Sequence, residues 1–184
     1  RSTRDLVRLL NDEDTTVPAA GADAGDALAA AIDAVVDRMR RGGRLVYAGA
    51  GTSGALAALD AAECGSTFGS PPGEVLAVVA DQDADEDDRA AATNALHGLT
   101  LRPEDCVVAV SASGSTPFAL AALEVARDVG ALGVAVACVP DSRAASLAQH
   151  EVAVVVGPEV IAGSTRLKAG TAQKLVLNTI STVT

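Results

Sequence analysis

Two loops rich in glycine and hydroxyl residues contain the side chains best suited to chemistry. The first, GAGTSG, spans Gly49–Gly54, and the second, SASGST, spans Ser111–Thr116. Glycine lets the backbone approach a ligand closely, and the N–H groups at the start of a helix attract anions. Ordinary helix capping needs only one hydroxyl, whereas these loops carry several. We therefore predict a phosphate-binding site made by Gly51, Thr52, Ser53, Ser111, Ser113, Gly114, Ser115 and Thr116.

The first loop also satisfies the G-x-G-x-x-G pattern of dinucleotide-binding proteins. A dinucleotide site needs an acidic residue about 20 positions later, at the end of the second strand. The available residue, Asp81, lies 27 positions after Gly54, which is too far. Thr52 and Ser53 offer hydroxyl donors inside the loop and favour a phosphate monoester instead.

Both loops follow apolar runs and precede helical patterns. Apolar runs typical of buried parallel strands occur at 44–49, 75–80, 106–112, 133–139 and 151–157. Helical patterns occur at 3–11, 26–41, 53–63, 87–96, 117–129 and 142–148, and a last helix is expected from Ser164 to the chain end. This alternation predicts an α/β fold, a doubly wound five-stranded parallel sheet flanked by helices in flavodoxin-like order. Its ligands are expected at the carboxyl edge of the sheet.

The length of 184 residues suits one domain. We expect an N-terminal helical segment at 1–43 and a phosphosugar-binding domain at 44–184. The chain starts without Met and ends inside an apolar helical pattern. We therefore expect a piece of a longer protein, truncated at the C-terminus.

Composition restricts the partners and the compartment. The formal charge of -10 and the low isoelectric point argue against nucleic acid as a partner. The cysteines are odd in number and far apart in the sequence, at Cys64, Cys106 and Cys138, which indicates a reduced, cytoplasmic protein. With two histidines and no C-x-x-C motif, no metal site is expected. No apolar stretch is long enough to span a bilayer, so no membrane association is expected.

The second loop, with the proline after it, resembles the phosphosugar loop of SIS (sugar isomerase) domains. Longer segments resemble N-acetylmuramic acid 6-phosphate etherases: GRLVYAGAGTSG, LDAAEC, TFG, VVGPEVIAGSTRLKAGTAQKLVLN and the opening LNDEDTTVP. The resemblance covers nearly the whole chain. It implies a lyase of peptidoglycan recycling that removes D-lactate from N-acetylmuramic acid 6-phosphate and leaves N-acetylglucosamine 6-phosphate, without a metal or redox cofactor.

The resemblance also implies a mechanism and two catalytic residues. The 3-ether is eliminated from the ring-opened aldehyde by loss of the C2 proton, and water then adds. A glutamate in the helix after the first glycine loop matches Glu63, which would protonate the departing lactate oxygen. A glutamate in an E-D pair before the next helix matches Glu86, which would handle the C2 proton or the water. Positioned acids and bases typically contribute ~10²–10⁴-fold each.

A third polar cluster precedes the last helix, in GSTRLKAGTAQK. Ser164 and Lys168 of this cluster are expected to bind substrate, and Thr165 lies beside them. Helix capping with solvated charges is the alternative explanation. The resemblance implies that the cluster lies near the sugar, contributed by the neighbouring subunit of a homodimer with shared sites.

Several positions depart from the family pattern. Ala55 and Ser115 stand where the family usually has arginine, and Gly65 and Ser66 replace a proline pair. The segment before Glu86 is also shorter. Two alternatives therefore stay open: a non-catalytic sugar-phosphate-binding regulator, like the glucokinase regulatory protein, and a phosphosugar isomerase.

Overall fold

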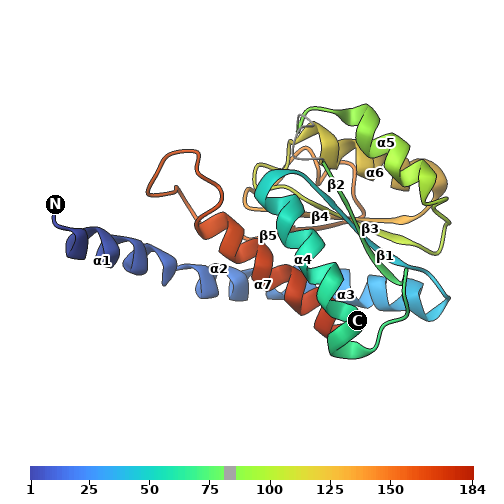
Figure 1. The fold of residues 1–184 in the computed structure, drawn as a ribbon, viewed down its shortest axis with the longest axis horizontal. Helices are drawn as coiled ribbons and strands as arrows, with labels where there is room; N and C mark the ends of the chain where they lie inside the picture. Colours follow the sequence, from blue (N-terminus) through green and yellow to red (C-terminus); the bar gives the residue numbers. More distant parts are fainter. Residues whose placement is uncertain (81–85) are drawn as a thin grey trace.

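A computed structural model describes residues 1–80 and 86–184, and it has a parallel sheet at its centre (Figure 1). The strands are β1 (Leu45–Gly49), β2 (Val75–Val79), β3 (Cys106–Val110), β4 (Leu132–Ala137) and β5 (His150–Ala153). All neighbouring strands pair in parallel, in the order β2-β1-β3-β4-β5. The predicted five-stranded, doubly wound sheet in flavodoxin-like order is confirmed.

Helices cover both faces of this sheet. They are α1 (Thr3–Asp14), α2 (Val17–Asp23), α3 (Gly25–Arg40), α4 (Gly51–Phe68), α5 (Arg89–Gly98), α6 (Pro117–Val129) and α7 (Lys168–Val183). Side chains of α3, α4 and α7 share one core with the sheet, and those of α5 and α6 form the core on the opposite face (Figure 1). Alanine and valine dominate both cores, which lets the helices lie close to the strands.

One predicted helix is absent, and the predicted start of another is wrong. Residues 142–148 form turns rather than a helix, because the chain makes only a few helical hydrogen bonds there before β5 begins. The last helix starts at Lys168 and not at Ser164. The carboxylate of Glu159 accepts hydrogen bonds from the N–H groups of Lys168 (3.1 Å) and Ala169 (3.0 Å), so it caps the helix that Ser164 was expected to cap.

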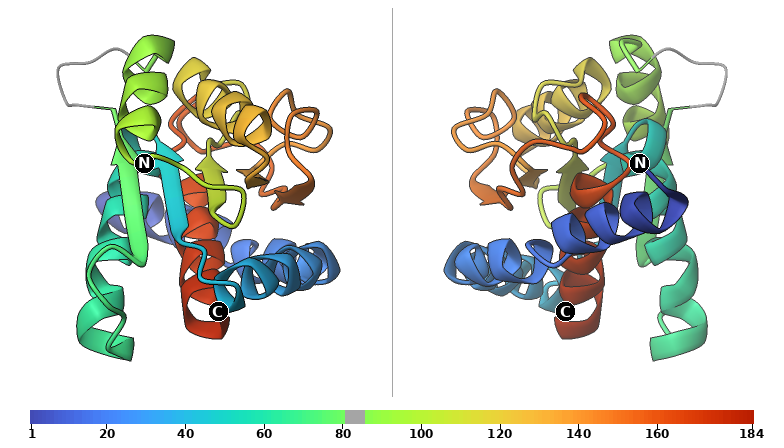
Figure 2. Two further views of the ribbon diagram at one scale, coloured as in Figure 1. Left: turned by 90° about the vertical axis from the view of Figure 1, so that its right-hand side faces the viewer. Right: turned by 90° about the vertical axis from the view of Figure 1, so that its left-hand side faces the viewer.

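Helix α1 lies outside the cores. It projects from the body at the end where α7 begins (Figures 1 and 2), and none of its residues is buried against the described part of the chain. Its C-terminal end is nevertheless attached to the body. Glu13 accepts a hydrogen bond from Nζ of Lys168 at 2.6 Å, and the Lys168 side chain is only 4% exposed.

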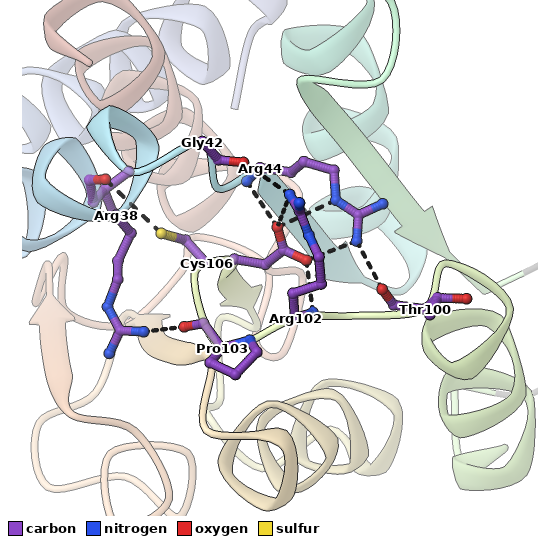
Figure 3. Close-up of polar contacts among 9 residues, drawn as sticks. Arg38, Gly42, Arg44, Thr100, Arg102, Pro103 and Cys106 are labelled. Atoms are coloured by element: carbon purple, nitrogen blue, oxygen red, sulfur yellow. Dashed lines mark hydrogen bonds and ion pairs between the residues drawn. The ribbon is translucent and has the colours of Figure 1, made fainter.

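A buried ion pair fixes the amino edge of the sheet. Asp105 is fully buried and accepts hydrogen bonds from Nη2 of Arg44 (2.6 Å) and from the backbone N–H groups of Arg44 and Arg102 (both 2.9 Å). Figure 3 shows both arginines beside the turn that carries Thr100 and Pro103. Burial by itself would raise the pKa of Asp105, but these hydrogen bonds outweigh it and lower the pKa below its ordinary value.

Among the described residues, no helix combines the length and the apolar character that crossing a membrane requires.

Candidate phosphosugar site

The two glycine loops leave neighbouring strands at the carboxyl edge of the sheet. Strands β1 and β3 pair directly, and Gly49 at the end of β1 lies opposite Val110 at the end of β3. The strand order reverses between these two strands, and ligands of open α/β sheets bind at such a point. The sheet therefore brings the loops together.

The first loop turns sharply and begins α4 at once. Gly51 has a φ of +55°, and Ala50 before it is extended. A Cβ on Gly54 would lie 2.7 Å from the carbonyl oxygen of Gly49, so only glycine permits this approach of helix to strand. The start of α4 is thereby held against the end of β1.

The second loop contains a chain of hydroxyls. Ser111 is buried, and its Oγ lies 2.8 Å from Oγ1 of Thr116 and 3.4 Å from Oγ of Ser113. Oγ of Ser113 in turn accepts hydrogen bonds from the hydroxyl (3.0 Å) and the backbone N–H (3.2 Å) of Ser115. The four predicted hydroxyls thus form one network around Gly114.

No side chain caps the start of α4 or of α6 among the described residues. Within the described residues, neither Ala50 at the start of α4 nor Thr116 at the start of α6 makes a side-chain capping bond. Ordinary capping is therefore not the role of the loop hydroxyls here. The starts of α4 and α6, which both lack a side-chain cap, converge at one edge, and their dipoles favour a bound anion.

We expect Gly114→Ala to abolish sugar-phosphate binding. Gly114 has a φ of +61°, and a Cβ there would lie 2.3 Å from Cβ of Ser142. The loop must shift to relieve both the strain and the overlap, which displaces its hydroxyls. Gly98→Ala, at a position with no atom within 4 Å, is the matched control. Calorimetric titration with N-acetylglucosamine 6-phosphate would measure the difference, and unchanged binding by a folded Gly114→Ala variant would contradict the assignment.

The structure places Glu86 beside the second loop. Its carbonyl oxygen accepts a hydrogen bond from the N–H of Phe118 in the first turn of α6 (3.1 Å), and the residue is exposed. Asp81, the acidic residue available for a dinucleotide site, lies outside the described residues.

Glu63 lies apart from this cluster within one chain. It is exposed and follows Gly51 by 12 positions on α4. At 1.5 Å per residue, this distance is about 18 Å along the helix. Glu63 lines a small pocket of about 120 Å³ between α4 and α7, together with Asn178 and Ser181. One hexose phosphate held by the loops does not extend that far.

A buried carboxylate lies one turn before Glu63. Asp60 is 6% exposed, and its Oδ1 accepts a hydrogen bond from Oγ of Ser181 on α7 at 3.1 Å. Burial, followed by the charge of Asp60, raises the pKa of the Tyr47 hydroxyl on β1. This contact joins α4 to α7 at the level of Glu63.

The start of α7 lies against the first loop. A Cβ on Gly170 would be 3.5 Å from Cγ2 of Thr52, and Ser53 donates a hydrogen bond to Oε1 of Gln173 at 2.9 Å. Of the predicted cluster, Ser164 lies in the turn before α7, and Lys168 directs its ammonium group to Glu13 of α1. Glu13 and Gln173 were not predicted, because a polar residue inside a helical pattern gives no signal of its tertiary contacts.

The cysteines are buried thiols. Burial raises the pKa of Cys106 to about 12 and that of Cys138 to about 11, and it also raises the pKa of Cys64. All three are free. Because the thiolate is the reactive form, these groups are poor nucleophiles.

Comparison with known proteins identifies the family of this chain. Residues 16–138 match the family model described as SIS domain. A relative from Rubrobacter xylanophilus, named N-acetylmuramic acid 6-phosphate etherase, is 53% identical over 98% of this chain and 63% of its own length. Two relatives of the same name also match. One from Streptomyces avermitilis is 54% identical over 99% of this chain and 61% of its own length, and one from Pasteurella multocida is 46% identical over 98% of this chain and 63% of its own length. The resemblance to etherases is therefore confirmed. The chain spans less than two thirds of the length of these relatives.

Solved structures match the fold. A phosphoheptose isomerase from Neisseria gonorrhoeae superposes with a TM-score of 0.78 at 16% identity, covering 98% of this chain and 97% of that one. The Vibrio vulnificus NanR protein complexed with ManNAc-6P superposes with a TM-score of 0.63 at 16% identity, covering 97% and 63%. At such identities the likeness establishes the architecture alone.

Proposed function

Because this chain belongs to the SIS domain family, we propose that its paired glycine loops bind a phosphorylated amino sugar and that the protein is an N-acetylmuramic acid 6-phosphate etherase. The identity of about half of its residues to relatives of that name carries the proposal. The starts of α4 and α6, which lack side-chain caps, support a phosphate at the loops.

The reaction proceeds by elimination and then hydration. A base removes the C2 proton of the ring-opened aldehyde, a double bond forms between C2 and C3, and the C3–O bond breaks. The departing oxygen takes a proton and leaves as D-lactate. Water then adds its hydroxyl to C3 and a proton returns to C2, which gives N-acetylglucosamine 6-phosphate. No electrons are exchanged with a cofactor.

The two glutamates take separate roles in this scheme. Glu86 lies beside the phosphate loop and handles the C2 proton or the water. Glu63 protonates the lactate oxygen. Its distance from the loops of its own chain supports a site shared by two copies, in which the loops of one chain and Glu63 of its partner face the same sugar. Ser164 and Lys168 belong to the same composite site.

The proposal includes a homodimer in the cytoplasm, where cell-wall sugars are recycled. The three free, buried cysteines suit a reducing compartment.

Isotope labelling tests the reaction type. In water enriched in ¹⁸O, elimination and hydration place ¹⁸O at C3 of N-acetylglucosamine 6-phosphate and none in the lactate, as mass spectrometry would show. Label in the lactate would refute cleavage of the C3–O bond. Ketose phosphate without lactate would identify an isomerase, and tight binding without turnover would identify a regulator.

A further inference from the structure

A buried amide on α7 contacts the first glycine loop. Gln173 is 2% exposed, and its Oε1 accepts the hydrogen bond from the Ser53 hydroxyl at 2.9 Å. Its Nε2 is buried and has no hydrogen-bond partner among the residues that the structure describes. Gly170, less than one turn earlier on α7, lies against Thr52. The amide is therefore held at the start of α4, where the loop is expected to receive a phosphate.

The orientation of this amide determines what Ser53 can offer a ligand. A serine hydroxyl has one proton to donate. When Oε1 faces Ser53, that proton is used inside the protein and Nε2 stays unsatisfied. When the amide turns through 180°, Nε2 donates to Oγ of Ser53. The Ser53 hydroxyl is then free to point its hydrogen toward the loop. Both arrangements contain a hydrogen bond, but only the second makes Ser53 a donor to an anion.

We propose that Gln173 is a positioning residue of the phosphate site, which turns its amide so that Nε2 donates to Ser53 and Ser53 donates to the bound phosphate. An anion at the loop places a second acceptor beside Ser53, so two acceptors compete for one proton until the amide turns. The inference rests on the proposed function only in placing a phosphate at this loop. It holds for any phosphomonoester, whether or not lactate is released.

Gln173→Glu tests the inference through its pH dependence. An ionised carboxylate can only accept, so it holds the Ser53 proton and removes one donor from the phosphate. We expect the Kd for N-acetylglucosamine 6-phosphate to rise about tenfold or more above pH 7 relative to wild type. The protonated acid can donate as an amide does. The ratio to wild type should therefore return toward one as the pH falls and the new carboxyl group becomes protonated.

Two further variants separate positioning from a structural role. Gln173→Met keeps the shape, leaves the Ser53 hydroxyl able to turn, and should bind within severalfold of wild type. If Gln173→Glu fails to fold, Gln173→Met is compared in the wild-type and Ser53→Ala backgrounds. The substitution should change the Kd, by severalfold at most, only where Ser53 is present. Gln149→Glu makes the same chemical change at a glutamine that accepts from the N–H of Gly133, away from the loops, and should show no pH-dependent loss.

Calorimetric titrations from pH 5 to 8, repeated with inorganic phosphate, decide the outcome. Equal binding by Gln173→Glu and wild type at pH 8 would overturn the inference, and so would a loss that is the same at every pH or persists with Ser53→Ala. Binding with this pH profile but without lactate release would refute the etherase and leave Gln173 in its role. Failure of wild type to bind either probe would overturn both.

Discussion

Glu63→Gln should lower D-lactate release from N-acetylmuramic acid 6-phosphate by about 10²–10⁴-fold, because the lactate oxygen loses its proton donor. Glutamine keeps the size of the side chain, and Glu63 is exposed, so folding should not change. The glycine loops are remote from this residue within the chain, and N-acetylglucosamine 6-phosphate should bind within severalfold of wild type. Initial rates from a coupled D-lactate assay, with calorimetric binding, measure both effects.

Mixing inactive variants tests where Glu63 acts. Glu63→Gln and the double variant Ser111→Ala/Thr116→Val damage different halves of the proposed shared site. If two copies exchange freely, half of the dimers are mixed, and each mixed dimer has one intact site. The mixture should therefore regain about one quarter of wild-type activity. A mixture as inactive as its components, despite demonstrated subunit exchange, would refute the shared site. Glu104→Gln, the same change away from α4, should keep full activity.

Asp105→Asn should destabilise the fold by about 3 kcal/mol, since breaking a buried ion pair leaves an arginine without its counter-charge. Asp105 is fully buried against Arg44 at the amino edge of the sheet. For a chain of this size the loss corresponds to a fall in Tm of roughly 6–12 °C. Asp37→Asn is the matched control, because its ion pair with Arg41 is largely exposed and worth little. Urea unfolding would show the difference, and equal effects of the two variants would contradict the role of Asp105.

The stability supplied by Asp105 should depend on pH in a defined direction. Its folded pKa is lowered, so the unfolded chain binds the proton more readily. The contribution is fully present above the unfolded value of about 3.9 and is lost as the pH falls through the folded pKa. The difference in unfolding free energy between wild type and Asp105→Asn should therefore shrink below about pH 4. A constant difference between pH 7 and pH 3 would contradict the lowered pKa.

The sheet and its glycine loops could be predicted because their signals are local. Strands β1 to β4 are short apolar runs, as parallel strands covered on both faces require, whereas β5 begins with His150 and Glu151. The loops join strand to helix at residues whose backbone needs glycine, as Gly54 and Gly114 show. Parallel pairing then places both loops at one edge without further information.

The remaining features depend on contacts between distant parts of the chain. Glu159 caps α7 in place of the nearer Ser164, because the tertiary path of the loop brings its carboxylate to the helix start. A glutamine in a helix is usually exposed, and only the packing of α7 on α4 buries Gln173 beside Ser53. The end of α4 at Phe68, five residues beyond the predicted end at 63, is fixed by Gly69, which adopts a left-handed conformation there.

Direct assay of the purified chain with N-acetylmuramic acid 6-phosphate tests whether the protein is an etherase. The site described here predicts D-lactate and N-acetylglucosamine 6-phosphate in equal amounts, and no ketose phosphate by NMR. Intact substrate, recovered from a folded protein that binds the sugar phosphate, would contradict the etherase assignment.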